Sequence, residues 1–297
     1  MISLRRNLSI LAAAVFALGA TAAFAGGVAV RPVVVELYTS QGCSSCPPAD
    51  ALIGKLAQRP GVLAITLPIT YWDMLGWKDT LATDANTRRQ KAYAAAMGHG
   101  GVYTPQIVID GVTDVVGSRA ANVEAAIAQR RAMLGNALAV AVARNDSARF
   151  AADAARAQAA ANAAPGAMPV ALPVVPAAPS WADPVVAVAL TQAQQEMHVD
   201  IGAAPGAHNA TVWMFHLRAQ VSVNIPAGEN GGRTITYHNV VGDLKAIGVY
   251  KGRAMTLTLP RAGNVPHDGV AVVVQQDGYG HVIGAAYVGR PDYYAQQ

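Results

Sequence analysis

Residues 33–56 read VVVELYTSQGCSSCPPADALIGKL, and this stretch holds both cysteines of the 297-residue chain, Cys43 and Cys46. The apolar run 33–39 is typical of a buried strand, and the leucine and isoleucine spacing within 49–59 predicts a helix. The cysteines therefore lie in the turn that joins a strand to a helix. A sulfur at that place meets the unpaired N–H groups and the positive dipole end of the helix, which lower the pKa of a thiol.

Redox chemistry is the favoured interpretation of this cysteine pair, and it needs no cofactor beyond the Cys43–Cys46 disulfide itself. A thiolate attacks disulfides, so Cys43 is the expected nucleophile. Cys46 follows one helical turn later and is expected to resolve a mixed disulfide formed on Cys43.

Two alternatives for the cysteines remain open. Two thiolates form half of a zinc site or a complete copper(I) site, and His99 is the nearest candidate for a further ligand. In an oxidising compartment, however, two such thiols tend to form a disulfide. A purely structural disulfide is the other alternative, although closing so small a loop constrains the unfolded chain little.

The first 25 residues have the features of a secretory signal peptide. Arg5 and Arg6 precede an apolar stretch, and the tripeptide AFA at 23–25 supplies small residues at the cleavage positions. We therefore expect a periplasmic or secreted protein that has no membrane attachment after cleavage. The formal net charge of +4 and the absence of a clustered Lys/Arg stripe indicate no nucleic-acid partner.

Residues 145–184 divide the chain, because this segment is rich first in alanine and then in alanine and proline. Such a composition predicts a linker or insertion with little capacity to bury a core. The segment separates a first domain at 28–144 from a second domain at 185–290. The first has the order strand–helix–strand, helix, strand–strand–helix, with a hairpin at Asp110-Gly111. The second has seven strand-like runs between Gly, Pro and Asn turns, which predict an all-β, sandwich-like domain.

Four separated motifs resemble, in the same order, those of the secreted, thioredoxin-like domain-of-unknown-function family 1223. They are VVELYTSQGCSSCPPADAL (34–52), YWDMLGWKD (71–79), GVYTPQIVIDG (101–111) and GENGGRTITYHNVV (228–241). The resemblance covers nearly all of the mature chain except the Ala/Pro segment. It implies an α/β fold with a thioredoxin-like first domain, in which Thr104-Pro105 is a cis-proline bond facing the cysteines. Pro68 departs from the pattern, because a histidine commonly stands there in the family.

Glu36 is a further candidate, since a charged side chain in an apolar strand is costly unless it has a task. By resemblance to thioredoxins, it would be the buried acid that assists proton transfer to the resolving cysteine. The alternative is a glutamate that faces solvent at a strand edge. Tyr71, Trp72 and Asp73 follow the second strand, at the end where ligand-facing residues of open α/β sheets collect. They are expected to rim the cysteine site, and aromatic packing under a long loop is the alternative.

The motif GENGGRTITYHN (228–239) is glycine-rich, but a strand rather than a helix follows it, which disfavours a phosphate-binding loop. We expect Arg233, Tyr237 or His238 to form a surface near the cysteine site that helps to select substrates. The sequence thus predicts a thiol–disulfide oxidoreductase that acts on protein or small-molecule thiols and disulfides. The alternative is a non-enzymatic thioredoxin-like binding module, or a copper- or metal-handling protein.

Overall fold

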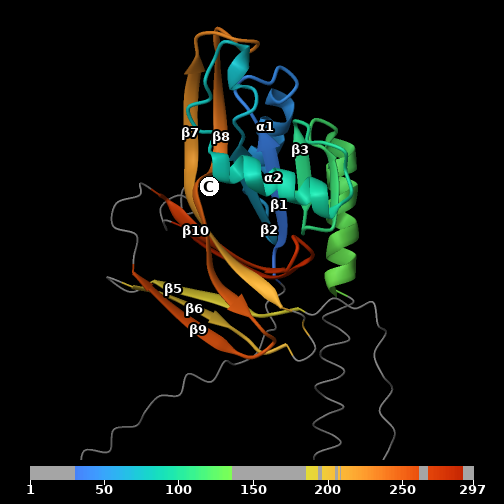
Figure 1. Ribbon diagram of the computed structural model, residues 1–297, viewed down its shortest axis with the longest axis vertical. Coiled ribbons are helices and arrows are strands. Elements are labelled where there is room, and N and C mark those ends of the chain that lie inside the picture. Colours follow the sequence, from blue (N-terminus) through green and yellow to red (C-terminus); the bar gives the residue numbers. More distant parts are fainter. Residues whose placement is uncertain are drawn as a thin grey trace, which may run out of the picture.

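The computed structural model describes residues 31–135, 185–192, 196–204, 207, 209–260 and 267–289. The expected signal peptide and the Ala/Pro-rich segment lie outside the described residues and stay predictions. Figure 1 shows the described elements coloured along the chain, with the helices beside the strands of a large, bent sheet.

The N-terminal half of the described chain alternates strands and helices. Its elements are β1 Val33–Thr39, α1 Pro47–Leu56, β2 Val62–Pro68, the short 3-10 helix Asp73–Leu75, α2 Asp84–Ala96, β3 Gln106–Ile109 and β4 Thr113–Val116. Residues 120–135 form a further helix. The helices expected at 49–59, 84–98 and 122–135 are therefore present, with ends that differ by a few residues.

The expected hairpin at Asp110-Gly111 joins β3 to β4, which pair antiparallel. Both turn residues have positive φ, 51° at Asp110 and 67° at Gly111. The amide of Val112 donates to the carbonyl of Ile109 at 3.0 Å, so Asp110 and Gly111 are the two central residues of the turn, and two positive φ values there favour Asp followed by Gly. A Cβ on Gly111 would also collide with the carbonyl oxygen of Gly280, so glycine is required there for space as well as for conformation.

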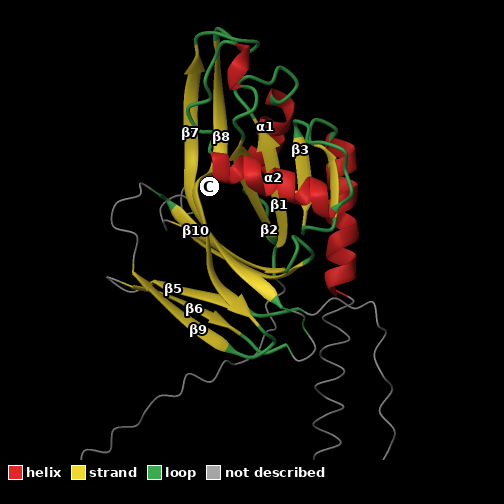
Figure 2. Ribbon diagram, in the orientation of Figure 1, coloured by secondary structure: helices red, strands yellow, loops and turns green. Residues whose placement is uncertain are grey.

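The C-terminal half of the described chain consists of strands (Figure 2). They are β5 Val188–Gln192, β6 Glu196–Ile201, β7 Ala210–Ile225, β8 Arg233–Tyr250, β9 Met255–Pro260, β10 Gly269–Gln276 and β11 Val282–Gly289. Each of the seven strand-like runs in the sequence corresponds to one of these strands. Residues 243–248 resemble a short helical turn in sequence, but they continue β8, because their partners on β7 hold them in an antiparallel ladder.

The two halves of the chain share one eight-stranded mixed sheet with the order β11-β10-β7-β8-β2-β1-β3-β4. β8 joins β2 in parallel through the pair Thr66 and Val240. The sequence predicts an all-β domain on its own sheets, and in this respect the prediction is wrong. The strands β5, β6 and β9 form a separate three-stranded sheet with the order β5-β6-β9.

Both faces of β1 are buried, and they belong to different cores. Val33, Val35 and Leu37 pack with α1 and with the helix 120–135. Val34 and Tyr38 pack on the opposite face with α2 and with parts of β7, β10 and β11. α1 and the cysteine turn that precedes it therefore lie on one face of the sheet, and α2 lies on the other.

A third core lies between the three-stranded sheet and the strands β7, β10 and β11. Along β10, Val270, Val272 and Val274 face this core, whereas Ala271 and Val273 face the core that contains α2. This alternation follows from the period of two in a strand. The two sheets thus pack face to face, as in a sandwich, although one of them continues into the N-terminal half. None of the helices described here is long and apolar enough to cross a membrane.

Candidate active site at the Cys43–Cys46 disulfide

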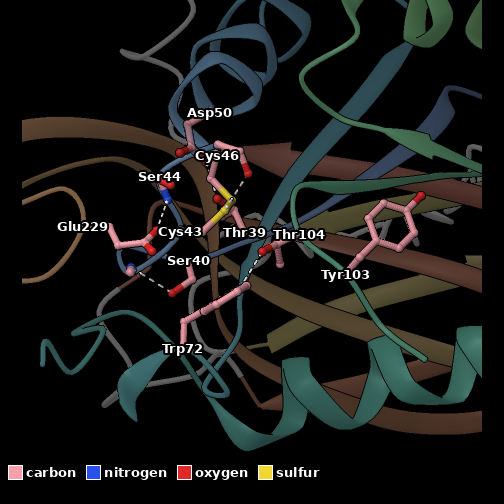
Figure 3. Close-up of a disulfide and its surroundings, with 12 residues drawn as sticks. Thr39, Ser40, Cys43, Ser44, Cys46, Asp50, Trp72, Tyr103, Thr104 and Glu229 are labelled. Carbon is pink, nitrogen blue, oxygen red and sulfur yellow. Dashed lines mark hydrogen bonds between the residues drawn. A yellow bond between two sulfur atoms is a disulfide. The ribbon is translucent and has the colours of Figure 1, made fainter. Parts of the chain in front are cut away.

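Cys43 and Cys46 form a disulfide in the turn before α1 (Figure 3). The amide of Cys43 donates to the carbonyl of Ser40, and the amide of Cys46 donates to the carbonyl of Cys43, each at 3.1 Å. Cys46 is the N-cap residue of α1, and no side chain caps the helix. Pro47 and Pro48 occupy the first turn, where missing N–H groups cost no internal bond. The disulfide therefore lies at the positive end of the helix dipole.

Both cysteines are buried in this oxidised form. Cys43 is 2% exposed and Cys46 is 0% exposed, although Ser44 and Ser45 between them are exposed. The hydroxyl of Ser45 lies 3.4 Å from the sulfur of Cys43. Cys43, the expected nucleophile, is thus nearly as enclosed as Cys46. Access to either sulfur depends on the segments that cover the turn.

The loop at the tip of the β7–β8 hairpin is the first of these segments. Asn230 is 1% exposed, and its side-chain amide donates to the carbonyls of Gln41 at 3.0 Å and of Cys43 at 2.9 Å. The carboxylate of Glu229 accepts from the amide of Ser44 at 3.0 Å. Hydrogen bonding by the Ser44 side chain and, second, by its amide holds the pKa of Glu229 below its usual value. The glycine-rich motif that sequence analysis singled out therefore contacts the cysteine turn directly.

The segment after β2 covers the turn from another side. Trp72 donates from its indole nitrogen to the hydroxyl of Thr104 at 2.7 Å. Its Cβ lies 3.1 Å from the position that a Cβ on Gly42 would take, so a side chain at residue 42 would push against it. Trp77 donates to the side-chain oxygen of Gln41 at 2.7 Å. Trp72 thus packs beside the cysteine turn, between Gly42 and Thr104.

Tyr71 and Asp73 have different roles from that of Trp72. Tyr71 packs against the core that contains α2 and contacts the Trp72 ring, with centroids 6.0 Å apart. Asp73 accepts from the amide of Asp79 at 3.0 Å. Asp79 is buried and in turn accepts from the amide of Gln41 at 2.8 Å. Asp73 therefore supports the cysteine turn through Asp79.

The Thr104–Pro105 peptide bond is cis, as the family resemblance implied. Figure 3 shows Thr104 beside the disulfide, on the side of Trp72. The carbonyl of Pro105 accepts from the amide of Gly117 at 2.8 Å, which fixes the start of β3 against the end of β4. The disulfide, Trp72 and Thr104 thus meet at one place in the fold.

Glu36 does not belong to this site, so its expected role beside Cys46 is wrong. Its carboxylate accepts two hydrogen bonds from Arg89, at 2.6 and 2.8 Å. It accepts one further bond from Tyr93 at 2.8 Å and one from Tyr38 at 3.0 Å. The solvent-facing alternative is wrong as well, because Glu36 is 0% exposed. Glu36 shares the face of β1 that packs on α2, and α1 with its cysteines lies on the other face.

Asp50 is the buried acid of the cysteine site, and sequence analysis missed it. It is 2% exposed, its amide donates to the carbonyl of Cys46 at 3.1 Å, and one carboxylate oxygen accepts from the hydroxyl of Thr39 at 2.7 Å. Burial raises the pKa of Asp50 to about 8, against the lowering effect of the Thr39 bond. The signal was available, because Asp50 follows Cys46 by four residues and so shares a helical face with it.

Tyr237 of β8 lies near this acid. It is 1% exposed, and burial raises the pKa of its hydroxyl, with the charges of Asp50 and Asp79 raising it further. The Tyr237 hydroxyl and the second oxygen of Asp50 are both buried without a hydrogen-bond partner in the described structure. Tyr237 thus lies beside the acidic part of the cysteine site.

His238 and Arg233 lie on the neighbouring surface of β8. The His238 ring packs on α1 at Gly54, and burial lowers its pKa. Arg233 is exposed and donates to the side-chain oxygen of Asn230 at 3.2 Å. Both residues line a groove between α1 and β8, together with Pro47. The volume of this groove is about 690 Å³. The structure therefore places all three β8 residues beside α1, next to the cysteine turn.

His99 does not approach the cysteines as a third ligand. Its ring lies 2.9 Å from the carboxylate of Asp114 on β4. Within the described ranges, no group of three or more His, Cys, Asp and Glu side chains could hold a metal ion.

These features define a mixed α/β protein with a buried disulfide at the start of a helix, beside a cis-proline. The chain belongs to the family described as "Protein of unknown function (DUF1223)", which matches residues 34–177 and 170–275. A stretch of 37 residues, 12% of the chain, is 46% identical to a probable thioredoxin of Archaeoglobus fulgidus. That match spans only 41% of the thioredoxin.

The overall arrangement is similar to that of a solved structure, and a second solved structure matches more weakly. A crystal structure of an Agrobacterium tumefaciens protein has a TM-score of 0.62 and 27% identity, covering 86% of this chain and 93% of that one. HBP35 of Porphyromonas gingivalis has a TM-score of 0.46 and 12% identity, covering 88% and 75%.

Proposed function

We propose that this chain is an exported thiol–disulfide oxidoreductase with a thioredoxin-like N-terminal half. The observation that carries the proposal is the environment of the Cys43–Cys46 disulfide, which combines the start of α1, the cis Thr104–Pro105 bond and the buried acid Asp50. A helix start stabilises a thiolate, and a buried acid that titrates near neutral pH accepts or donates protons. The similarity of 37 residues to a probable thioredoxin also supports a thiol–disulfide oxidoreductase.

The proposed reaction is a two-step exchange that transfers two electrons. In the reduced protein, the Cys43 thiolate attacks one sulfur of a substrate disulfide, forms a mixed disulfide and releases the first substrate thiolate. Cys46 then loses its proton and attacks the Cys43 sulfur, which releases the second substrate thiolate and forms the Cys43–Cys46 disulfide. The substrate is reduced and the protein is oxidised. The reverse sequence oxidises a substrate dithiol.

Asp50 is the proposed acceptor of the Cys46 proton. With a pKa of about 8, a minority of Asp50 carboxyls is ionised at neutral pH and a growing share above it, and this ionised form accepts a proton. Thr39 holds one carboxylate oxygen, and the other oxygen has no partner among the residues described, so it is available for the proton. Asp50 thus takes the role that the resemblance to thioredoxins implied for Glu36.

Substrate thiols and disulfides, of proteins or small molecules, would reach the disulfide between Trp72, Thr104 and the tip of the β7–β8 hairpin. An extended peptide would pair with the backbone of Thr104. Because Asn230 holds the turn closed, the hairpin tip would shift before a protein substrate reaches Cys43. The signal peptide expected at residues 1–25 supports a periplasmic or secreted location.

The burial of the disulfide favours a second candidate function, that of a non-enzymatic binding module. Both cysteines are buried, and side chains from two other segments bond to their turn. A disulfide that only holds this loop would make the chain a non-enzymatic binding module. The redox potential separates the two functions, because structural disulfides resist reduction by the glutathione pool.

The test is to equilibrate the protein in glutathione redox buffers and to trap its thiols by alkylation. An oxidoreductase should have a midpoint potential of about −120 to −270 mV, whereas a structural disulfide should lie below about −300 mV. A Cys46→Ser variant should also accumulate mixed disulfides with proteins of an exported fraction. Adducts should be absent from the matched Cys43→Ser variant. A potential below that limit, together with adduct-free lanes for both variants, would favour the binding module.

A further inference from the structure

The groove between α1 and β8 adjoins the cysteine turn, and the proposed exchange reaction does not use it. Its volume is about 690 Å³. Pro47 lines the groove and directly follows Cys46 in the chain. Arg233 also lines it and donates to Asn230, whose amide donates to the carbonyl of Cys43. A molecule in this groove would therefore lie next to the disulfide.

The shape of the groove suits an extended chain. Its helical wall is one stripe along α1, formed by Pro47, Ala51, Gly54, Lys55 and Gln58. Over these residues a helix rises about 16 Å, at 1.5 Å per residue, which is the length of about five residues of extended chain. Ala51 and Gly54, in the middle of the stripe, have little or no side chain. They leave room for a peptide to lie along the helix.

The formal charges of the groove are positive. Lys55 and Arg233 are exposed on opposite walls, and no carboxylate lines the groove. The ion pairs of the described residues involve other cations, so neither charge is neutralised by them. Glu229 of the hairpin tip bonds instead to the amide of Ser44. Burial lowers the pKa of His238, so its ring is mostly neutral at neutral pH.

We propose that this groove binds an extended, acidic segment of the protein whose disulfide or thiols exchange with Cys43 and Cys46. The inference rests on the proposed function, because it names the class of protein that the oxidoreductase prefers. Carboxylates of the segment would pair with Lys55 and Arg233, and its backbone would lie along Ala51. Charge-assisted hydrogen bonds to a guanidinium are stronger than neutral ones, which favours carboxylates over amides at this place.

The first test measures binding alone, with the oxidised full chain and peptides that lack cysteine. Titrations followed by NMR compare acetylated, amidated Asp-Thr-Glu-Val-Asp-Thr with its amide counterpart Asn-Thr-Gln-Val-Asn-Thr. At low salt the acidic peptide should bind about fivefold more tightly, as two exposed ion pairs allow. High salt should remove the difference, because it screens exposed charges. Succinate, a small dicarboxylate, should displace the peptide only weakly.

Variants of the groove test where the peptide binds. Lys55→Glu and Arg233→Glu should each remove the preference for the acidic peptide, and the double variant should prefer Lys-Thr-Lys-Val-Lys-Thr. Ala51→Trp should weaken binding several-fold, because the new ring would fill the groove. Lys91→Glu and Ala95→Trp are the matched controls, since both residues are exposed on α2, on the other face of the sheet. Circular dichroism and unfolding midpoints check that each variant is folded.

The second test measures exchange, with peptide disulfides that carry the acidic or the amide sequence beside one cysteine. The reduced protein should reduce the acidic disulfide about fivefold faster, and Lys55→Glu should remove this preference. Equal binding of the two peptides, equal affinities of Lys55→Glu and Lys91→Glu, or succinate that competes as well as the peptide would overturn the proposal. Equal exchange rates would overturn the groove's role in substrate choice. Groove-dependent binding without exchange of either disulfide would support the binding site and contradict the redox function, so the two failures are distinguishable.

Discussion

The side-chain amide of Asn230 donates to the carbonyl of Cys43 at 2.9 Å, across a separation of 187 residues in the sequence. The same amide donates to the carbonyl of Gln41, so one side chain spans the turn that holds the disulfide. Because β8 also pairs with β2, the β7–β8 hairpin is fixed to the N-terminal half at two places. The C-terminal half therefore takes part in the cysteine site directly.

Replacing Asn230 with alanine should make the Cys43–Cys46 disulfide more accessible to a reductant. Asn230→Ala removes both hydrogen bonds, so the disulfide should be reduced several-fold faster by a phosphine reductant such as TCEP. The measurement is the loss of disulfide with time, followed by alkylation of the new thiols. Asn224→Ala is the matched control, since Asn224 is exposed on the same hairpin and lies opposite Thr234 of β8. Equal rates for Asn230→Ala and the unchanged protein would mean that opening of the hairpin tip does not limit reduction.

Asp50 should make the stability of the protein depend on pH. Its pKa is about 8 in the folded protein and about 3.9 in an unfolded chain. Between these values the folded state holds a proton that the unfolded state has lost. The free energy of unfolding should therefore fall by about 1.4 kcal/mol per pH unit from pH 4 to pH 8 through this group. It should not change through Asp50 below or above that window.

Asp50→Asn should remove this part of the pH dependence, as measured by urea unfolding of the oxidised protein at each pH. Thr39→Val is a useful companion, because the Thr39 hydroxyl bond lowers the pKa of Asp50. Without that bond the pKa of Asp50 should be higher, so the fall in the free energy of unfolding should continue to a higher pH. A decline of the same slope in Asp50→Asn would show that another group is responsible.

Most of the secondary structure can be predicted from the sequence, because it depends on the pattern of apolar and turn residues within each segment. The run 33–39 is β1, and the seven strand-like runs of the C-terminal half are all strands. The shared sheet could not be predicted from the sequence, since β2 and β8 pair through Thr66 and Val240, which are far apart in the chain. Nothing in the pattern of either strand marks the other as its neighbour.

The error over Glu36 has a physical reason in the same strand. All seven residues of β1 are buried, so its sequence shows no alternation of apolar and polar residues. The sequence therefore does not reveal whether Glu36 lies on the α1 face or on the α2 face of the sheet. Asp50 was easier to find in principle, because its spacing from Cys46 and Ile53 places all three on one face of α1. The cysteine pair itself was identified correctly as a turn before a helix, because its strand, its prolines and its helix are contiguous in the sequence.

Glu36→Gln should destabilise the fold without affecting the disulfide. The change leaves the Arg89 guanidinium, which is buried, without its counter-charge. Breaking a buried ion pair costs about 3–5 kcal/mol. The control is Glu124→Gln, since Glu124 pairs with Arg59 at the surface at 2.6 Å, with side chains 41% and 34% exposed. That exposed pair should contribute only about 0–1 kcal/mol.

Urea unfolding should separate the two glutamine variants, and the redox equilibrium in glutathione buffers should be the same for both. A shift of the midpoint potential in Glu36→Gln alone would restore a role for Glu36 in the chemistry of the cysteines.

The contact between Gly54 and His238 should hold α1 against β8, and it provides the last prediction. A Cβ on Gly54 would lie 2.7 Å from Cδ2 of the His238 ring, closer than real contacts allow. Gly54→Ala should therefore destabilise the protein by about 1–3 kcal/mol, as overpacking does. In a His238→Ala background the clash is absent, and the same change should stabilise α1 by up to about 1 kcal/mol, because alanine favours helix over glycine.

Gly135→Ala is the control for helix propensity, because Gly135 lies in the helix 120–135 with open space around its missing Cβ. It should be neutral or stabilising in either background. A double-mutant cycle from urea unfolding measures the coupling between residues 54 and 238. If the redox potential of the Cys43–Cys46 pair also shifts in Gly54→Ala but not in Gly135→Ala, the position of α1 against β8 tunes the cysteine site. An additive cycle would instead show that the His238 ring moves aside at no cost.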